Sequence, residues 1–246
     1  MSQKPREPET ALIWERPEPA PRPKPEPLSR ERIVRAALTL ADTEGLASVS
    51  VRKVAAALDA GPMRLYGYVS TKEELLELMV DAVYGELVAE GPLRGSWREA
   101  LRAMAQRTRR AAHAHPWLVD LLVGRIHLGP HALAYLEAAL AALDGAPGFE
   151  TVDAILQAVG TVNAFVIGAI RNEASERSAE RESGMTKKEW QHATSPYLER
   201  MVATGRFPML GKVMREATHP SFDVAFDQGL DCILEGLATR LPRRKK

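Results

Sequence analysis

Residues 51–76 read VRKVAAALDAGPMRLYGYVSTKEELL, and their pattern predicts two short helices separated by a tight turn. Ser50, immediately before this segment, is a residue type that caps helix N-termini, and apolar residues follow it at helical spacing. Gly61 and Pro62 suit the cap and the first position of a second helix, which we expect to end near Gly67. Two short helices joined by such a turn form a helix-turn-helix.

A further helix is predicted on each side of this unit. Ser29 can cap the preceding helix, and Gly45 is suited to end it. Thr71 and Glu74 have the spacing of a capping box, which opens a longer helix reaching about Val88. The apolar residues of the preceding helix recur at helical spacing and are Ile33, Ala36, Ala37, Leu40 and Ala41.

The remaining sequence also predicts helices. Ser96 and Thr186 open two more capping boxes, residues 124–130 are interrupted by glycine and proline, and a charged stretch occupies residues 171–183. We find no strand-like alternation and no internal repeat. The predicted fold class is therefore all-α, with an N-terminal three-helix helix-turn-helix unit joined to a larger helical bundle. The main helices of the bundle are expected at about 96–114, 133–143, 151–171 and 221–239.

These patterns divide the chain into four segments. Residues 1–28 form a proline-rich arm, with eight prolines in the first 27 residues, and we expect it to be extended and disordered. Residues 29–75 form the helix-turn-helix domain, and residues 76–240 form the larger helical domain. Residues 241–246 are a basic tail.

The overall composition predicts a cytoplasmic protein. The net charge is +1, so the chain as a whole has no bias toward nucleic acid. Cys232 is the single cysteine and excludes an intrachain disulfide. The N-terminus has no signal-peptide core, and we expect no membrane span because charges, Gly or Pro interrupt every apolar run.

Local charge around the helix-turn-helix predicts double-stranded DNA as a partner. Residues 50–72 carry four basic side chains against one acidic one, Asp59, in a nearly neutral chain. Hydroxyl groups lie beside these charges, and both kinds of group bind phosphate oxygens. The second helix of such a unit enters the major groove. The basic residues are Arg52, Lys53, Arg64 and Lys72, and the hydroxyl-bearing ones are Ser50, Tyr66, Tyr68, Ser70 and Thr71.

The same region resembles the DNA-binding domain of the tetracycline-repressor (TetR) family. The Leu65-Tyr66 pair, the aromatic Tyr68 and the Ser-Thr-Lys-Glu run after it carry the resemblance, together with the helix over residues 33–45. The resemblance implies a sequence-specific transcription regulator that binds a pseudo-palindromic operator as a homodimer. Repression relieved by a small-molecule ligand is the behaviour that the family implies, although sequence does not distinguish a repressor from an activator.

The resemblance also assigns roles within the DNA-binding site. Arg64 lies midway along the recognition helix, where a guanidinium can pair with guanine O6 and N7, or contact phosphate alone. Lys72 is expected to bind phosphate at the start of the next helix. Tyr66 and Tyr68 match phosphate-binding positions, with core packing as the alternative. The complete predicted set is Ser50, Val51, Arg52, Pro62, Met63, Arg64, Tyr66, Gly67, Tyr68 and Lys72.

The C-terminal part resembles the corresponding domain of the tetracycline repressor more loosely. Ser96-Trp97, the triplet starting at His127, and Gly148-Phe149 carry this likeness. It implies a dimer held by helices 151–171 and 221–239, and an ordinary buried helix is the alternative for the first of them. The predicted interface residues are Ile155, Val159, Val162, Val166 and Ile233.

A ligand pocket follows from the family rather than from the pattern. Met104, Thr108 and Ala139 fall where the tetracycline repressor uses polar or aromatic drug contacts, so we expect a largely apolar ligand rather than magnesium-bound tetracycline. Each predicted pocket residue has core packing as its alternative. The set comprises Trp97, Leu101, Met104, Trp117, Leu121, His127 and Phe165.

Two other classes of protein fit the sequence less well. A metal enzyme could use the histidines between residues 113 and 131, but Gly129-Pro130 breaks the helix between the last two, and no His-Glu-x-x-His motif or cysteine pair is present. We therefore expect no catalytic residues, no metal and no cofactor. A scaffold without DNA binding would have no reason to place Arg64 and Lys72 around a turn of this geometry. The four histidines are His113, His115, His127 and His131.

Overall fold

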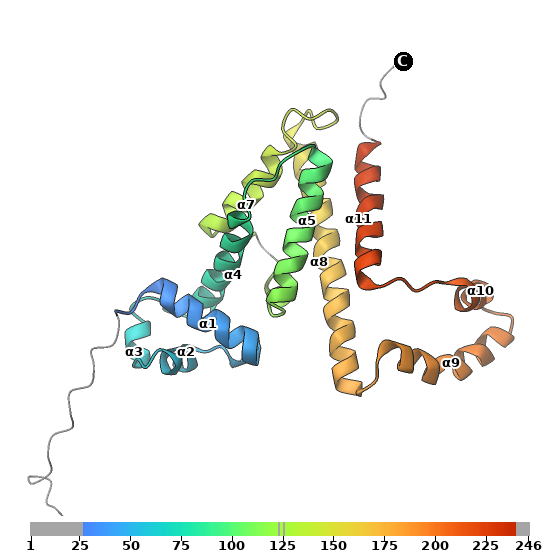
Figure 1. Ribbon diagram of the computed structural model, residues 1–246, viewed down its shortest axis with the longest axis horizontal. Coiled ribbons are helices and arrows are strands. Elements are labelled where there is room, and N and C mark those ends of the chain that lie inside the picture. Colours follow the sequence, from blue (N-terminus) through green and yellow to red (C-terminus); the bar gives the residue numbers. More distant parts are fainter. Residues whose placement is uncertain (1–26, 123, 125, 240–246) are drawn as a thin grey trace, which may run out of the picture.

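The computed structural model describes residues 27–122, 124 and 126–239, and every regular element within these ranges is a helix. Most of the proline-rich arm and the basic tail lie outside the described residues. Figure 1 shows a small N-terminal group of helices, a central bundle, and a helical arm that projects from it. The elements are α1 (Arg30–Glu44), η2 (Leu46–Ser48), α2 (Val51–Ala57), α3 (Pro62–Leu65), α4 (Lys72–Ala89), α5 (Trp97–Ala114), α6 (Leu118–Leu121), α7 (Pro130–Ala141), α8 (Val152–Ser183), α9 (Lys187–Ala203), α10 (Pro208–Glu216) and α11 (Phe222–Ala238).

Side-chain caps begin the helices of the N-terminal domain, as the sequence predicts. The hydroxyls of Ser29, Ser50 and Thr71 each accept a hydrogen bond from a backbone amide in the first turn of α1, α2 and α4. At Thr71 the reciprocal bond differs from a standard capping box, because the Glu74 carboxylate accepts from the amide of Ser70 at 2.6 Å. Leu65, 1% exposed, anchors α3 in the core of this domain.

The turn between α2 and α3 contains a strained residue. Asp59 has a φ of 48°, in the left-handed region that side chains with a Cβ rarely occupy. The conformation closes the end of α2, because the amide of Ala60 donates to the carbonyl of Ala55 at 2.9 Å and the amide of Asp59 donates to that of Ala56 at 3.1 Å. Glycine is the usual residue at this position of such a cap.

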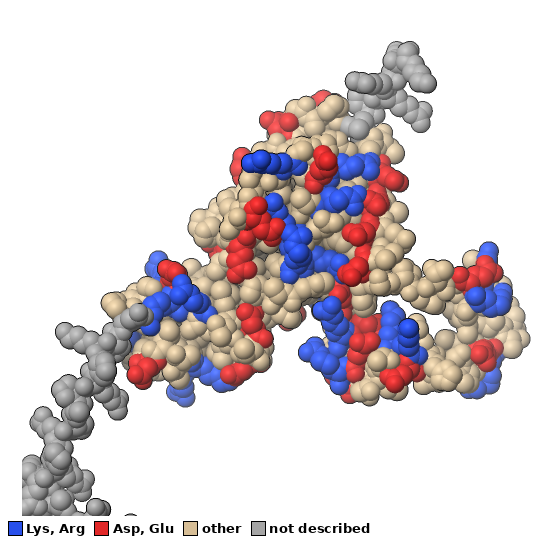
Figure 2. Space-filling view, viewed as in Figure 1, with Lys and Arg blue, Asp and Glu red and all other residues tan. Residues whose placement is uncertain are grey.

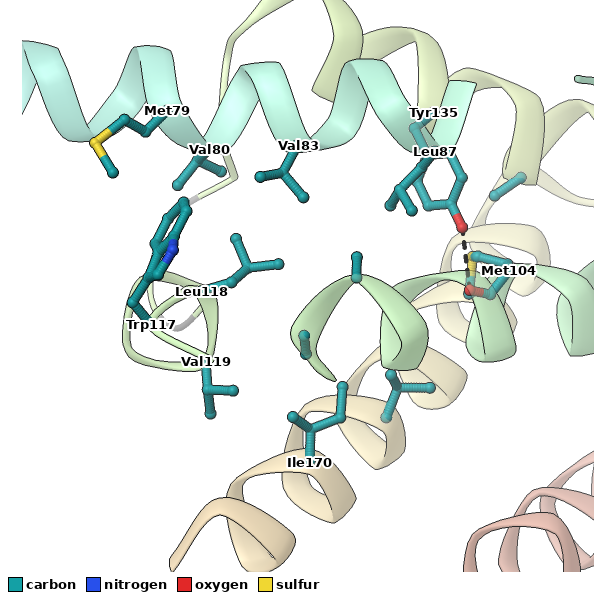
Figure 3. Packing of buried hydrophobic residues seen from close by; sticks show 14 of the residues in the cluster. Met79, Val80, Val83, Leu87, Met104, Trp117, Leu118, Val119, Tyr135 and Ile170 are labelled. Atoms are coloured by element: carbon teal, nitrogen blue, oxygen red, sulfur yellow. Dashed lines mark hydrogen bonds between the residues drawn. The ribbon is translucent and has the colours of Figure 1, made fainter. Parts of the chain in front are cut away.

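Helix α4 belongs to both domains. Its first turn packs in the N-terminal domain through the buried Leu75, and its later turns pack against α7 and α5, with buried apolar side chains that Figure 3 shows. Arg107 on α5 closes its C-terminal end by donating to the carbonyls of Gly91 at 2.6 Å and Leu87 at 3.4 Å. The apolar side chains of α4 labelled in Figure 3 are Met79, Val80, Val83 and Leu87.

The N-terminus of α7 is capped by a residue of another helix. Gly129, at the cap position, has no side chain to offer, and the Asp81 carboxylate of α4 accepts from the amides of His131 at 2.9 Å and Ala132 at 3.0 Å. A Cβ at Gly129 would overlap this carboxylate. Asp81 therefore fixes how α7 lies along α4.

Helix α8 differs from the sequence prediction in length. We expected it to end near Arg171 and to be followed by a separate charged stretch, but one helix of 32 residues continues to Ser183. Gly184, with a φ of 68°, is the residue that ends it. The charged half continues the helix because its Glu, Arg, Ser and Ala residues include strong helix formers and no helix breaker.

Helix α8 is also long and apolar enough to cross a membrane, judged by length and composition alone, although we expected no such run. In the structure it packs against α5, α6, α7 and α11. Core helices satisfy the same criterion as membrane spans, and 33% of the apolar window of α8 is buried inside the structure.

Helices α9 and α10 form an arm away from the bundle (Figure 1). No residue of α9 is buried, and α10 buries Gly211. Several large apolar side chains of the arm are exposed in a single chain, which leaves an apolar surface without a partner. These are Trp190, Tyr197, Met209, Leu210 and Val213.

We predict that Asp59→Gly stabilises the protein by about 1 kcal/mol, because glycine adopts the left-handed conformation without steric penalty. Denaturant unfolding at constant pH measures the change. Asp59→Ala is the matched control, since it removes the same carboxylate but retains a Cβ, and it should not be stabilising. Equal stabilisation by both variants would show that charge, and not backbone strain, is the source.

Candidate DNA-binding surface and C-terminal pocket

The recognition helix α3 presents an exposed surface. Met63 is 80% exposed, Tyr66 48% and Tyr68 38%, so neither tyrosine is a core residue. Pro62, Arg64 and Gly67 are also exposed. The predicted residues of α3 and the turn after it therefore lie where DNA can reach them, apart from the buried Leu65, which was predicted as the apolar anchor.

The basic side chains of this surface differ in how strongly they are neutralised. Lys53 pairs with Glu44 at 2.9 Å. Within the part of the chain that the structure describes, Arg52, Arg64 and Lys72 form no ion pair, so their charges are available for phosphate or base contacts. Figure 2 shows basic side chains on the lower surface of the N-terminal domain, beneath α2 and α3, with acidic ones between them.

Two predicted DNA-binding residues have other roles in the structure. Val51 is 9% exposed and packs in the core of the N-terminal domain, so its assignment to the DNA surface is wrong. It occupies the first position of α2, where the helix turns this side chain inward while Arg52 points outward. The Ser50 hydroxyl caps α2 by accepting from the Lys53 amide at 3.2 Å.

Several of the predicted ligand residues pack against other protein groups within the part of the chain that the structure describes. Leu101 is fully buried, Trp97 packs against Phe149 with ring centroids 5.2 Å apart, and the Trp117 indole donates to Asp42 at 2.7 Å. The single pocket therefore stays a prediction, with core packing as the role that the structure shows for Leu101 and Trp97. Helical spacing identifies inward positions, but inward side chains at the two ends of a bundle fill separate parts of its core.

His127, another predicted ligand residue, is held by protein groups. Its Nδ1 lies 3.1 Å from Glu77 of α4 and its Nε2 lies 2.9 Å from the Leu121 carbonyl. Met104 accepts from the Tyr135 hydroxyl through its backbone carbonyl at 3.0 Å (Figure 3). Burial raises the pKa of Tyr135 to about 12, so this phenol stays neutral and donates its proton.

Two open hollows border α8. The larger, of about 780 Å³, lies between α8, α6 and the end of α5. The smaller, of about 390 Å³, is lined by Phe165, Phe226, Ala164, Gly168 and Arg109. Of the predicted ligand residues, Phe165 is the one that lines either of these two hollows. Gly229 of α11 leaves room for its ring, because a Cβ there would overlap the Phe165 side chain.

Each histidine of the 113–131 cluster faces a carboxylate of its own, so the four do not converge. The pairs are His113 with Glu173, His115 with Asp42, His127 with Glu77, and His131 with Asp81. Among the described residues, no group of three or more His, Cys, Asp or Glu side chains is arranged to hold a metal ion.

The predicted dimer face of α8 is buried within its own chain. Ile155, Val159, Val162 and Val166 are between 0% and 7% exposed, and Ile233 of α11 is half-buried. The assignment of the four α8 residues to the interface is therefore wrong, because their own chain covers them, whereas the assignment of Ile233 stays a prediction. The exposed faces of these two helices include small and apolar residues: Leu156, Gly160, Ala164 and Gly168 on α8, and Ala225, Cys232 and Gly236 on α11.

The fold and the exposed recognition helix define a helix-turn-helix DNA-binding regulator, and comparisons with known proteins identify its family. Residues 33–79 match the model described as bacterial regulatory proteins, tetR family, and residues 91–241 match the tetracyclin repressor-like C-terminal domain. The chain therefore belongs to the TetR family of transcriptional regulators.

Individual relatives agree with this membership. The transcriptional repressor DrrR1 of Streptomyces coeruleorubidus is 38% identical over 237 residues, which cover 95% of this chain and 86% of that protein. The class E tetracycline repressor protein of Escherichia coli is 26% identical over 224 residues, covering 89% and 94%. ActR of Streptomyces coelicolor, solved in complex with actinorhodin, superposes with a TM-score of 0.75 at 28% identity, covering 89% of this chain and 100% of that one.

We predict that Arg64→Ala and Lys72→Ala weaken DNA binding in different ways. Loss of Arg64 should cost about 1–3 kcal/mol on the preferred operator and relax the preference at one base pair. Loss of Lys72 should weaken binding to all sequences alike and reduce the salt dependence by about one ion per subunit. Titrations over a set of single-base operator variants separate the two. A uniform loss for both would contradict base reading by Arg64.

Proposed function

We propose that this chain is a cytoplasmic repressor that binds a pseudo-palindromic operator as a homodimer and is released by a small, largely apolar molecule. The observation that carries the proposal is the continuity of α4, which starts beside the recognition helix and ends within the bundle. A ligand can lower DNA affinity only if it prefers a form in which the two recognition helices are wrongly placed. Helix α4 supplies the mechanical connection for that preference.

The two domains of this proposal meet along α4. Residues 29–75 bind DNA, and residues 76–240 carry the ligand site and the dimer interface. DNA contacts come from the exposed members of the predicted set. These are Arg52, Pro62, Met63, Arg64, Tyr66, Gly67 and Tyr68, with the half-buried Lys72 at the start of α4.

The dimer is supported by two surfaces that one chain leaves uncovered. The first comprises the exposed faces of α8 and α11, where Gly160, Gly168 and Gly236 have open space around them and permit close approach of another helix. The second is the arm of α9 and α10 with its exposed apolar side chains. Exposed apolar surfaces of this kind often mark protein–protein interfaces.

The ligand is proposed to enter the part of the bundle next to α4. Met104, Thr108 and Ala139 are buried there and offer two apolar walls and one hydroxyl. The Tyr84 and Tyr135 rings lie close by, with centroids 5.8 Å apart, and burial raises the pKa of both phenols. An aromatic or other apolar molecule suits this lining better than a metal-bound drug. ActR, which was solved with actinorhodin and with (S)-DNPA, provides the two compounds to test first.

For the dimer, we predict that Leu156→Asp and Val166→Asp have different consequences. Leu156 is 58% exposed and Val166 is 1% exposed in the single chain. A charge at Leu156 should give a folded monomer, whereas the same charge at Val166 should destabilise the subunit itself by several kcal/mol. Sedimentation and thermal unfolding distinguish these results. A folded dimer for Leu156→Asp would place the interface elsewhere.

For the ligand, we predict that DNA and the releasing molecule weaken each other's binding by the same factor, because coupling between two sites is reciprocal. Calorimetry with actinorhodin and (S)-DNPA, on free protein and on protein bound to operator, measures both sides of the cycle. Minocycline with Mg²⁺ is the contrasting compound and should not release the operator. A compound that binds free and operator-bound protein equally would contradict ligand-controlled repression.

A further inference from the structure

A polar contact ties α1 of the N-terminal domain to the end of α5. The Asp42 carboxylate on α1 accepts from the Trp117 indole at 2.7 Å and faces Nδ1 of His115 at 2.8 Å, both through Oδ1. His115 and Trp117 are 9% and 4% exposed. Asp42 lies in the segment that matches the family's DNA-binding model, and the other two residues lie in the segment that matches its C-terminal model.

The second nitrogen of His115 also faces a carboxylate. Nε2 lies 3.3 Å from Oε2 of Glu86 on α4. A neutral imidazole has one N–H to donate, whereas the protonated ring has two, and an ionised carboxylate can only accept. The charged imidazolium is therefore the form that satisfies Asp42 and Glu86 together.

The surroundings of the ring favour the same form. His115 is the C-cap of α5, where the carbonyl ends of the helix attract a positive charge. Burial disfavours the charged ring, but hydrogen bonding and Coulomb attraction to Asp42 and Glu86 outweigh burial and raise the pKa of His115. Asp42 from α1 and Glu86 from α4 are the charged groups that face it, and the Trp117 ring lies 5.7 Å away.

We propose that His115, as the imidazolium, is a positioning residue that holds α1 and α4 in the relative orientation with which the dimer engages both halves of its operator. The proposal rests on the proposed function, since it requires two recognition helices on one DNA. A domain that is free to reorient loses that freedom when both half-sites are bound, and a contact that fixes the orientation beforehand lowers this entropic penalty. Binding of one isolated half-site carries no such requirement.

The pH dependence has a definite sign. The pKa of His115 is raised in the folded protein. The stabilisation from its contact with Asp42 and Glu86 is therefore complete below the ordinary histidine pKa, and it is lost as the pH rises through the raised pKa. Affinity for the complete operator should therefore fall as the pH rises through that range. Affinity for a single half-site should not show this fall.

The test compares His115→Gln with His113→Gln on a full operator and on a duplex carrying one half-site. Glutamine cannot carry the charge, so His115→Gln should bind the full operator about tenfold more weakly at low pH, with the histidine-dependent part of the pH profile removed. His113 pairs with Glu173 of α8 at 3.1 Å, away from α1, and its variant should keep the wild-type profile. Asp42→Asn should resemble His115→Gln.

Thermal unfolding of each variant accompanies the titrations. If His115→Gln does not fold, Glu86→Gln replaces it, because the Glu86 side chain is 56% exposed and its loss removes one of the two charges that favour the imidazolium. A wild-type pH profile in a folded His115→Gln or Glu86→Gln protein, or an equal loss on half-site and full operator, would overturn the positioning role alone. A wild-type protein with no preference for the full operator at any pH would overturn the proposed function, and the positioning role with it.

Discussion

Helix α4 cannot move at one end without moving at the other, and the rest of the structure is organised around this constraint. Its 18 residues span about 27 Å as one continuous helix. Thr71 and the buried Leu75 fix its first turn in the N-terminal domain, while Arg107 holds its last turn to α5. In the proposed mechanism, a displacement within the bundle therefore reaches the recognition helix as a rotation of the whole of α4 rather than as local unfolding.

Polar contacts specify how the other helices lie against α4. Apolar packing alone tolerates small shifts of one helix along another, but a buried charge tolerates none, because it must keep its partners. Asp81 fixes α7 along α4, and the carboxylate of Glu173 on α8, 4% exposed, binds Arg109 at 3.0 Å and His113 at 3.1 Å on α5. Among the described residues, no buried side-chain nitrogen or oxygen lacks a hydrogen-bond partner.

The sequence predicted what is encoded locally. Ser29, Ser50, Thr71 and Ser96 cap their helices where the pattern placed them, since a cap depends on residues only three positions apart. The exposed recognition helix followed from the same local rules. The continuation of α8 was missed because charged residues were taken as a boundary, although charge by itself does not end a helix.

The remainder depends on contacts between distant segments. Val166 and Leu156 are both apolar residues on α8, and nothing in the local pattern tells which one packs inside the chain and which one stays exposed. Asp42 and His115 are 73 positions apart, and no spacing rule could pair them. The pocket stays a prediction for the same reason, because helical spacing identifies inward-facing positions but does not tell which of them share one space.

In the proposed complex, two copies of this chain hold their recognition helices at a fixed spacing on symmetric DNA. Hydroxyl-radical footprinting of the DNA flanking the gene tests it most directly. We expect two protected half-sites related by two-fold symmetry, with centres about one helical turn, or a multiple of it, apart. A single asymmetric protected site, or uniform protection without sequence preference, would contradict it.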